Sequence, residues 1–145
     1  MLSKIPFLSL LVWAPILGGL WVFYVGGRRT STAKLLAYIL SLIVFAVSVY
    51  MAMQFNQNTY HMQFTERLPW IEPFNIYYHL GIDGISLVMI LLNNLITLLA
   101  IWSAWEVIEK NAPQFMASFL ILAGCMNGVF SALDSVLFYV FWEAL

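Results

Sequence analysis

Charged residues are scarce in this sequence, and cysteine is almost absent. The 145 residues include six Lys and Arg, seven Asp and Glu, and one Cys. So few charges cannot cover a water-soluble domain of this length, and their near balance gives no basic surface for nucleic acid. One cysteine excludes an internal disulfide, a cysteine-held iron–sulfur cluster and a structural zinc site within this chain. The composition therefore excludes a soluble globular domain, nucleic-acid binding and cysteine-based redox chemistry.

Apolar residues, by contrast, make up 63% of the chain and gather in long stretches without Lys, Arg, Asp or Glu. A helix rises about 1.5 Å per residue, so roughly 20 apolar residues cross a hydrocarbon core of about 30 Å. Four stretches have this length, and a fifth stops after 11 residues: Ile5–Val25, Leu35–Phe55, Ile85–Trp105, Gln114–Leu133 and Ser135–Leu145. The pattern predicts an all-α, polytopic membrane helix bundle with four complete transmembrane helices and the first half of a fifth, embedded in a lipid bilayer.

The first and last stretches differ from the other three. The first is longer than the apolar part of a signal peptide and contains Pro15, which a membrane helix tolerates where neighbours satisfy the freed carbonyl. The last would place the Leu145 carboxylate near the middle of the hydrocarbon, where an unpaired charge costs several kcal/mol. We therefore expect the chain to be the N-terminal part of a longer membrane protein.

Basic residues are distributed unequally between the two sides of the predicted membrane. Under the positive-inside rule, the side with more Lys and Arg in its short loops is cytoplasmic. One side carries four and the other two: Arg28, Arg29, Lys34 and Lys110 against Lys4 and Arg67. The first loop is therefore predicted to be cytoplasmic, with the N-terminus outside.

Glu143 is the only charged residue inside an apolar stretch. Eight helical steps from Ser135 place it about 12 Å into the membrane. Hydrocarbon disfavours the charged form of a carboxyl group and a nearby cation favours it, so Glu143 is poised to change its protonation. Tyr139 lies one turn earlier and could donate a hydrogen bond, whereas the first four spans offer no Lys or Arg. The alternative is that the fifth segment does not insert and ends at the interface.

Other polar and small residues in the spans are best explained by packing. Gly124 and Gly128 form a G-x-x-x-G pattern that gives a smooth face for close helix approach. Asn93, Asn94 and Asn127 could line a water path, but hydrogen bonding between helices is the commoner use of such residues.

The loop of residues 56–84 shows no motif for a metal or cofactor. Asp83 or Ser86 can cap the helix that follows it. His61 and His79 are most simply solvated loop residues and have no metal-ligand spacing with nearby carboxylates. We expect no cofactor in this chain.

Three motifs carry a resemblance to a known family. They are Leu80-Gly81-Ile82-Asp83-Gly84-Ile85-Ser86, Gly128-Val129-Phe130-Ser131-Ala132-Leu133-Asp134 and Phe138-Tyr139-Val140-Phe141-Trp142-Glu143. With them the chain resembles chain M of bacterial NADH:quinone oxidoreductase, an antiporter-like membrane subunit of respiratory complex I. The resemblance implies about fourteen helices, with two inverted repeats of five after three leading helices. Residues 1–113 would then hold the leading helices and the long 56–84 loop, and residues 114–145 the truncated start of the first repeat.

The resemblance also implies a function. Glu143 matches the family's essential membrane glutamate, which transfers protons and pairs with a lysine on a later helix outside these residues. The parent protein would lie in the bacterial inner membrane beside other complex I membrane subunits. It would couple quinone reduction to proton translocation, with NADH and quinone bound by other subunits. The alternatives are a subunit of a multisubunit cation/proton antiporter or membrane hydrogenase, and an inert truncated product.

Overall fold

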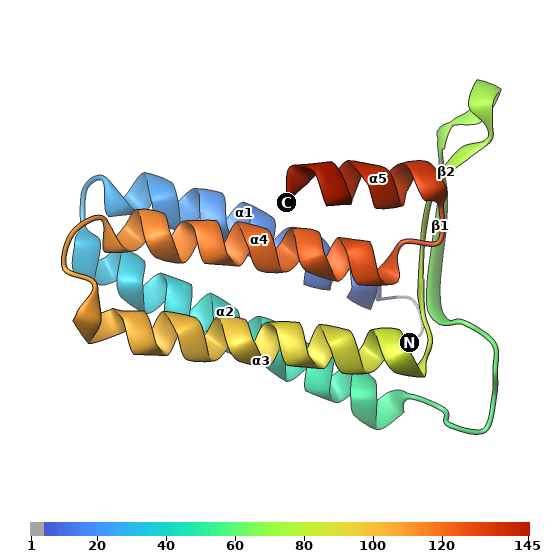
Figure 1. The fold of residues 1–145 in the computed structure, drawn as a ribbon, viewed down its shortest axis with the longest axis horizontal. Coiled ribbons are helices and arrows are strands. Elements are labelled where there is room, and N and C mark those ends of the chain that lie inside the picture. The colour runs from blue at the N-terminus through green and yellow to red at the C-terminus, as the bar shows by residue number, and fades with distance from the viewer. Residues whose placement is uncertain (1–4) are drawn as a thin grey trace.

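The computed structural model describes residues 5–145 and consists mainly of helices (Figure 1). Their bounds are α1 Phe7–Gly26, α2 Thr30–Gln54, α3 Gly84–Val107, α4 Ala112–Ser131 and α5 Ser135–Ala144. The helices α1 to α4 are each long and apolar enough to cross a membrane, and α5 is a shorter apolar helix. The predicted fold class, four complete spans followed by a shorter helical segment, is confirmed.

The four long helices form an antiparallel bundle, and α5 lies along α4 (Figure 1). α1 packs most extensively against α4, while α2 lies between α1 and α3. The two short connections, at residues 27–29 and 108–111, lie at the same end of the bundle (Figure 1). The four basic residues predicted to share one side of the membrane therefore lie at the same end of the bundle: Arg28, Arg29, Lys34 and Lys110. Lys4, which was counted for the other side, lies outside the described residues.

The segment predicted only as a long loop contains a β-hairpin. Strands β1 (Gln63–Ile71) and β2 (Ile76–Ile82) pair antiparallel, and the short 3-10 helix η2 (Glu72–Phe74) joins them. Asn75 follows with φ 54°, in the left-handed region that asparagine tolerates, and so closes the turn. The hairpin stands across the end of the bundle opposite the two short connections (Figure 1).

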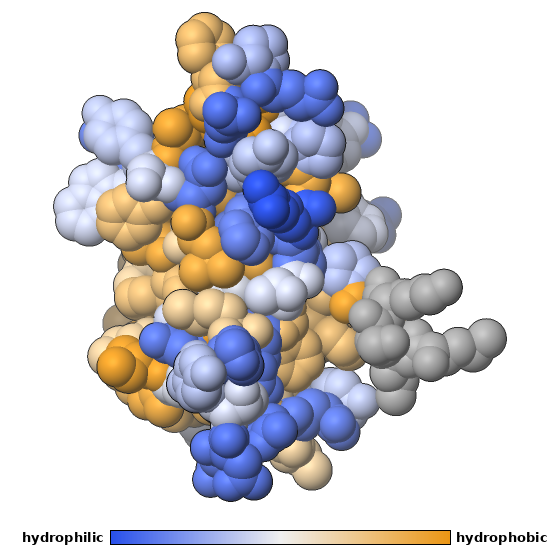
Figure 2. Space-filling view, turned by 90° about the vertical axis from the view of Figure 1, so that its right-hand side faces the viewer, coloured by the Kyte–Doolittle hydropathy of each residue, from blue (hydrophilic) through white to orange (hydrophobic). Residues whose placement is uncertain are grey.

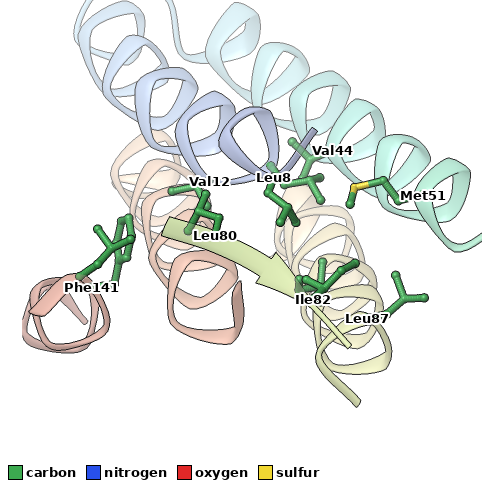
Figure 3. Close-up of a cluster of buried hydrophobic side chains, with 11 residues drawn as sticks. Leu8, Val12, Val44, Met51, Leu80, Ile82, Leu87 and Phe141 are labelled. Carbon is green, nitrogen blue, oxygen red and sulfur yellow. The ribbon is translucent and has the colours of Figure 1, made fainter. Parts of the chain in front are cut away.

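The inner strand of the hairpin completes the hydrophobic core at this end. Leu80 and Ile82 of β2 are fully buried and pack with Leu8 and Val12 of α1 and Met51 of α2 (Figure 3). The outer surface of the same end carries hydrophilic side chains among apolar ones (Figure 2). The hairpin therefore closes one end of the bundle, with a buried side toward the helices and a mixed surface outside.

Candidate functional site

Glu143 lies near the end of α5, on the side that faces away from the other helices. Leu137 and Phe141, one turn apart, are the buried residues of α5, at 3% and 5% exposure. Glu143 comes two residues after Phe141, about 200° further around the helix, and is exposed. Tyr139 shares the exposed face, but no hydrogen bond joins it to Glu143 in the described part of the chain. The hydrogen bond that their helical spacing allows is therefore not formed.

The position of Glu143 along the bundle follows from the start of α5. The helix begins at the hairpin end and ends about halfway along α4 (Figure 1). A rise of about 1.5 Å per residue places Glu143 about 12 Å from Ser135. The structure thus begins α5 at the residue that the sequence predicted and places Glu143 on a face that α1 to α4 leave open.

Asp134 fixes the beginning of α5. Its carboxylate accepts hydrogen bonds from the backbone N–H groups of Val136 at 2.9 Å and Leu137 at 3.3 Å, and from that of Tyr77 in β2 at 3.3 Å. Loss of hydration raises the pKa of Asp134, but these N–H donors together hold it below its ordinary value. One carboxylate therefore caps the helix that carries Glu143 and ties its start to the hairpin.

The joint before α5 is longer than the single residue that the sequence predicted. Leu133 donates its backbone N–H to the carbonyl oxygen of His79 at 2.9 Å, and Ala132 forms an isolated antiparallel bridge with Leu80. His79 is thus a half-buried residue of β2, not a solvated loop residue. The hairpin and the joint hold each other through the main chain.

A polar cluster links three helices in the hydrophobic interior. Asn127 of α4 donates to Asn94 Oδ1 at 3.0 Å and accepts from Asn93 Nδ2 at 2.9 Å, both in α3. Asn93 Nδ2 also donates to the carbonyl of Ala123 at 3.0 Å, whereas Asn94 Nδ2 is buried without a partner among the described residues. Hydrogen bonding between helices, the preferred interpretation of these asparagines, is confirmed.

Asn127 also compensates for a proline in α1. Pro15 has no N–H, so the carbonyl of Leu11, four residues earlier, loses its partner within the helix. Asn127 Nδ2 donates to that carbonyl at 3.0 Å. One turn before Asn127, Gly124 allows close approach, because a Cβ there would lie 2.5 Å from the carbonyl oxygen of Val12. α4 is therefore held against the irregular turn of α1 by both hydrogen bonding and shape, and the predicted packing role of Gly124 is confirmed.

A second polar group, which sequence reasoning missed, joins the hairpin to α1. The Glu66 carboxylate of β1 accepts hydrogen bonds from the backbone N–H groups of Leu8 at 3.1 Å and Ser9 at 3.3 Å, and from the Ser9 hydroxyl. Tyr78 of β2 contacts the same hydroxyl at 2.9 Å, and burial raises the pKa of Tyr78. Since α1 has no side-chain cap of its own, Glu66 supplies one from 57 residues away in sequence.

No metal site is found in residues 5–145. No three His, Cys, Asp or Glu side chains lie close enough together to hold a metal ion among them. Asp83 is the N-cap of α3, as predicted, and accepts from the backbone N–H of Ser86 at 2.8 Å.

Comparison with known proteins supplies the family context. No family model matches the chain. NADH-ubiquinone oxidoreductase chain 4 of Arabidopsis thaliana is 35% identical over 138 residues, covering 95% of this chain and 28% of that protein. NADH-quinone oxidoreductase subunit M of Rhodobacter capsulatus is 40% identical over 119 residues, covering 82% of this chain and 23% of that protein. The subunit M of Rickettsia typhi is 26% identical over 148 residues, covering 98% of this chain and 30% of that protein.

These similarities confirm the resemblance to chain M. The similarity to the three relatives runs through 82% to 98% of this chain, so it includes most of the bundle. The chain spans less than a third of the length of the curated relatives that it matches.

Proposed function

We propose that this chain, a homologue of NADH-quinone oxidoreductase subunit M, is part of a membrane subunit of a proton-translocating NADH:quinone oxidoreductase. Glu143 takes up and releases protons within that subunit. The observation that carries the proposal is the position of Glu143, a carboxyl group halfway along a bundle of spanning helices, on a face that the other helices leave open. Ionisable residues at membrane depth are costly and are retained mainly where protons or ions move.

Three basic side chains of the described residues are engaged in contacts with groups other than Glu143. Lys34 donates to the carbonyl of Trp105 at 2.8 Å, at the end of the bundle opposite the hairpin. Arg28 lies over the ring of Tyr24 and Arg67 over that of Tyr77. A cation brought toward Glu143 would favour its ionised form, and withdrawal of the cation would favour proton uptake.

We place the redox chemistry and the partners outside this chain. NADH and quinone would be bound by other subunits, and neighbouring membrane subunits of the same complex would cover the apolar helix faces. The protein would lie in the bacterial inner membrane with its N-terminus outside, because the end that carries four basic residues would be cytoplasmic. This orientation can be tested with a reporter enzyme that is active only outside the cytoplasm, fused at the 27–29 connection. The fusion should be inactive, and activity would contradict the orientation.

The test of the function is Glu143→Gln in the complete subunit, assembled in its complex. The amide keeps the shape of the side chain but cannot carry a proton, so proton pumping in reconstituted vesicles should be lost while the complex still assembles. Glu109→Gln is the matched control, because Glu109 is exposed in the connection between α3 and α4. Pumping at the normal rate by Glu143→Gln would show that the carboxyl is not needed and would refute the proposal.

A further inference from the structure

Gly128 is the point at which α4 meets α5. A Cβ at Gly128 would lie 2.6 Å from Cγ of Phe141 and within 2.8 Å of both Cδ atoms of its ring. Contacts this short do not occur between real side chains, and Cγ is too close to the backbone to swing away. α5 therefore packs at a distance from α4 that only glycine permits.

This contact determines which way Glu143 faces. Phe141 is 5% exposed and also packs against Trp13 of α1, with ring centroids 6.3 Å apart. Because the Phe141 ring is held on two sides, the rotation of α5 about its own axis is set at this residue. Glu143 follows two positions later, so its direction is fixed by the placement of Phe141.

α4 itself cannot move to absorb a larger residue at Gly128. Asn127, the preceding residue, is hydrogen-bonded to Leu11 of α1 and to Asn94 of α3. Gly124, one turn earlier, is already in close contact with the backbone of α1. Any group added at Gly128 therefore displaces α5 and not α4.

We propose that Gly128 is a positioning residue for proton transfer by Glu143, an inference that rests on the proposed function. Moving the nearest contact from 2.6 Å to an ordinary 3.4–4 Å displaces α5 by about 1 Å. Misplacing a reacting group by about 1 Å can cost up to about 100-fold in rate. Gly128→Ala should therefore lower proton pumping on the order of tenfold, at unchanged assembly of the complex, and should move the pH at which pumping is half-maximal.

The experiment compares four variants of the complete subunit in the assembled complex. They are Gly128→Ala, Gly84→Ala, Glu143→Gln and the double variant Gly128→Ala with Phe141→Ala. Gly84→Ala is the matched control, because a Cβ there meets nothing within 4 Å. The readouts are the amount of assembled complex, the rate of NADH oxidation, and pumping as a function of pH.

The expected result is reduced pumping and a shifted pH profile for Gly128→Ala. Pumping should recover in the double variant, because Phe141→Ala removes the Cγ and Cδ atoms that the new methyl group would meet. A pumping rate and pH profile equal to those of Gly84→Ala would overturn the inference. If Gly128→Ala fails to assemble, the double variant decides: recovery with a normal profile supports the inference and continued failure overturns it. Loss of pumping in Glu143→Gln with normal Gly128→Ala refutes only the positioning role, whereas normal pumping in Glu143→Gln refutes the function itself.

Discussion

Asn127 and Pro15 should be energetically coupled, because the side chain of one completes the hydrogen bonding that the other removes. Asn127→Ala deletes three hydrogen bonds, to the Leu11 carbonyl, to Asn94 and from Asn93. A hydrogen bond between membrane helices contributes about 0.6 kcal/mol on average, so the two bonds to α3 are worth about 1 kcal/mol together. The third loss leaves a buried carbonyl unpaired, which costs about 1–3 kcal/mol.

Replacing Pro15 by alanine changes only the third of these contributions. The new backbone N–H can donate to the Leu11 carbonyl within α1, so that carbonyl no longer depends on Asn127. The expected destabilisation by Asn127→Ala is therefore about 2–4 kcal/mol with Pro15 present and about 1 kcal/mol in the Pro15→Ala background. The difference between the two values is the coupling energy of a double-mutant cycle, which cancels the separate packing effect of removing the proline.

The assay is denaturant-induced unfolding of the purified complete subunit in mixed micelles, followed by helical circular dichroism, for all four members of the cycle. Ser118→Ala is the control for loss of a polar side chain from α4, because Ser118 donates only within its own helix, to Gln114. The loss of stability caused by Ser118→Ala should be the same with Pro15 and in the Pro15→Ala background. An equal cost of Asn127→Ala with Pro15 and with alanine at position 15 would refute the reasoning, because the freed carbonyl would then not depend on Asn127.

Two further changes test the ends of the helices. Asp83→Ala should destabilise the subunit by about 1 kcal/mol through loss of the N-cap of α3. The backbone and side-chain hydrogen bonds from Ser86 hold the pKa of Asp83 below its ordinary value, so the contribution of the carboxylate is present at neutral pH and is lost as pH falls through that lowered pKa. The free energy of unfolding should therefore fall more between pH 7 and pH 3 for the native subunit than for Asp83→Ala. Glu66→Ala should loosen the hairpin by removing the acceptor for Ser9 and the start of α1, seen as faster amide hydrogen exchange in β1 and β2, whereas Glu72→Ala at the exposed hairpin turn should leave exchange unchanged.

The spanning helices could be predicted from the sequence because their signal is local. Uncharged stretches of about 20 residues have only one stable conformation in a bilayer, since every backbone polar group must be satisfied within the segment. The exact ends were less predictable. α2 begins at Thr30, five residues before the predicted window, because Lys34 does not interrupt the helix. Its ammonium group reaches α3 and caps the carbonyls of Trp105 and Ile108.

The hairpin could not be predicted because its stability depends on contacts far apart in sequence. β1 contains Pro69 and charged residues that do not suggest a strand, and its pairing has two irregularities of register. The hairpin is stabilised by the hydrogen bonds of Glu66 to the start of α1, by the burial of Leu80 and Ile82 in the core, and by pairing with the 132–134 joint. None of these partners is recognisable until the helices are assembled.

The candidate site shows the same division between local and distant information. The start of α5 at Ser135 was predictable from the end of the uncharged stretch, and the small residues of α4 indicated a close helix contact. The partner of Gly128 was not predictable, because the sequence does not show which side of α5 faces α4. Tyr139 and Glu143 form no hydrogen bond for a related reason, because helical spacing brings two side chains onto one face but does not orient them toward each other.

The contacts of α5 explain how a carboxyl group can be held rigidly and still respond to its surroundings. Asp134 fixes the first turn of the helix to the hairpin, and Gly128 fixes its rotation through Phe141. Both contacts lie away from the face that carries Glu143, which is exposed. The backbone of α5 is therefore placed by this chain, and under the proposed function the charged partner of Glu143 is a group beyond the residues described. If the proposal holds, a change in the charge of that partner alters the proton affinity of Glu143 without movement of the helix.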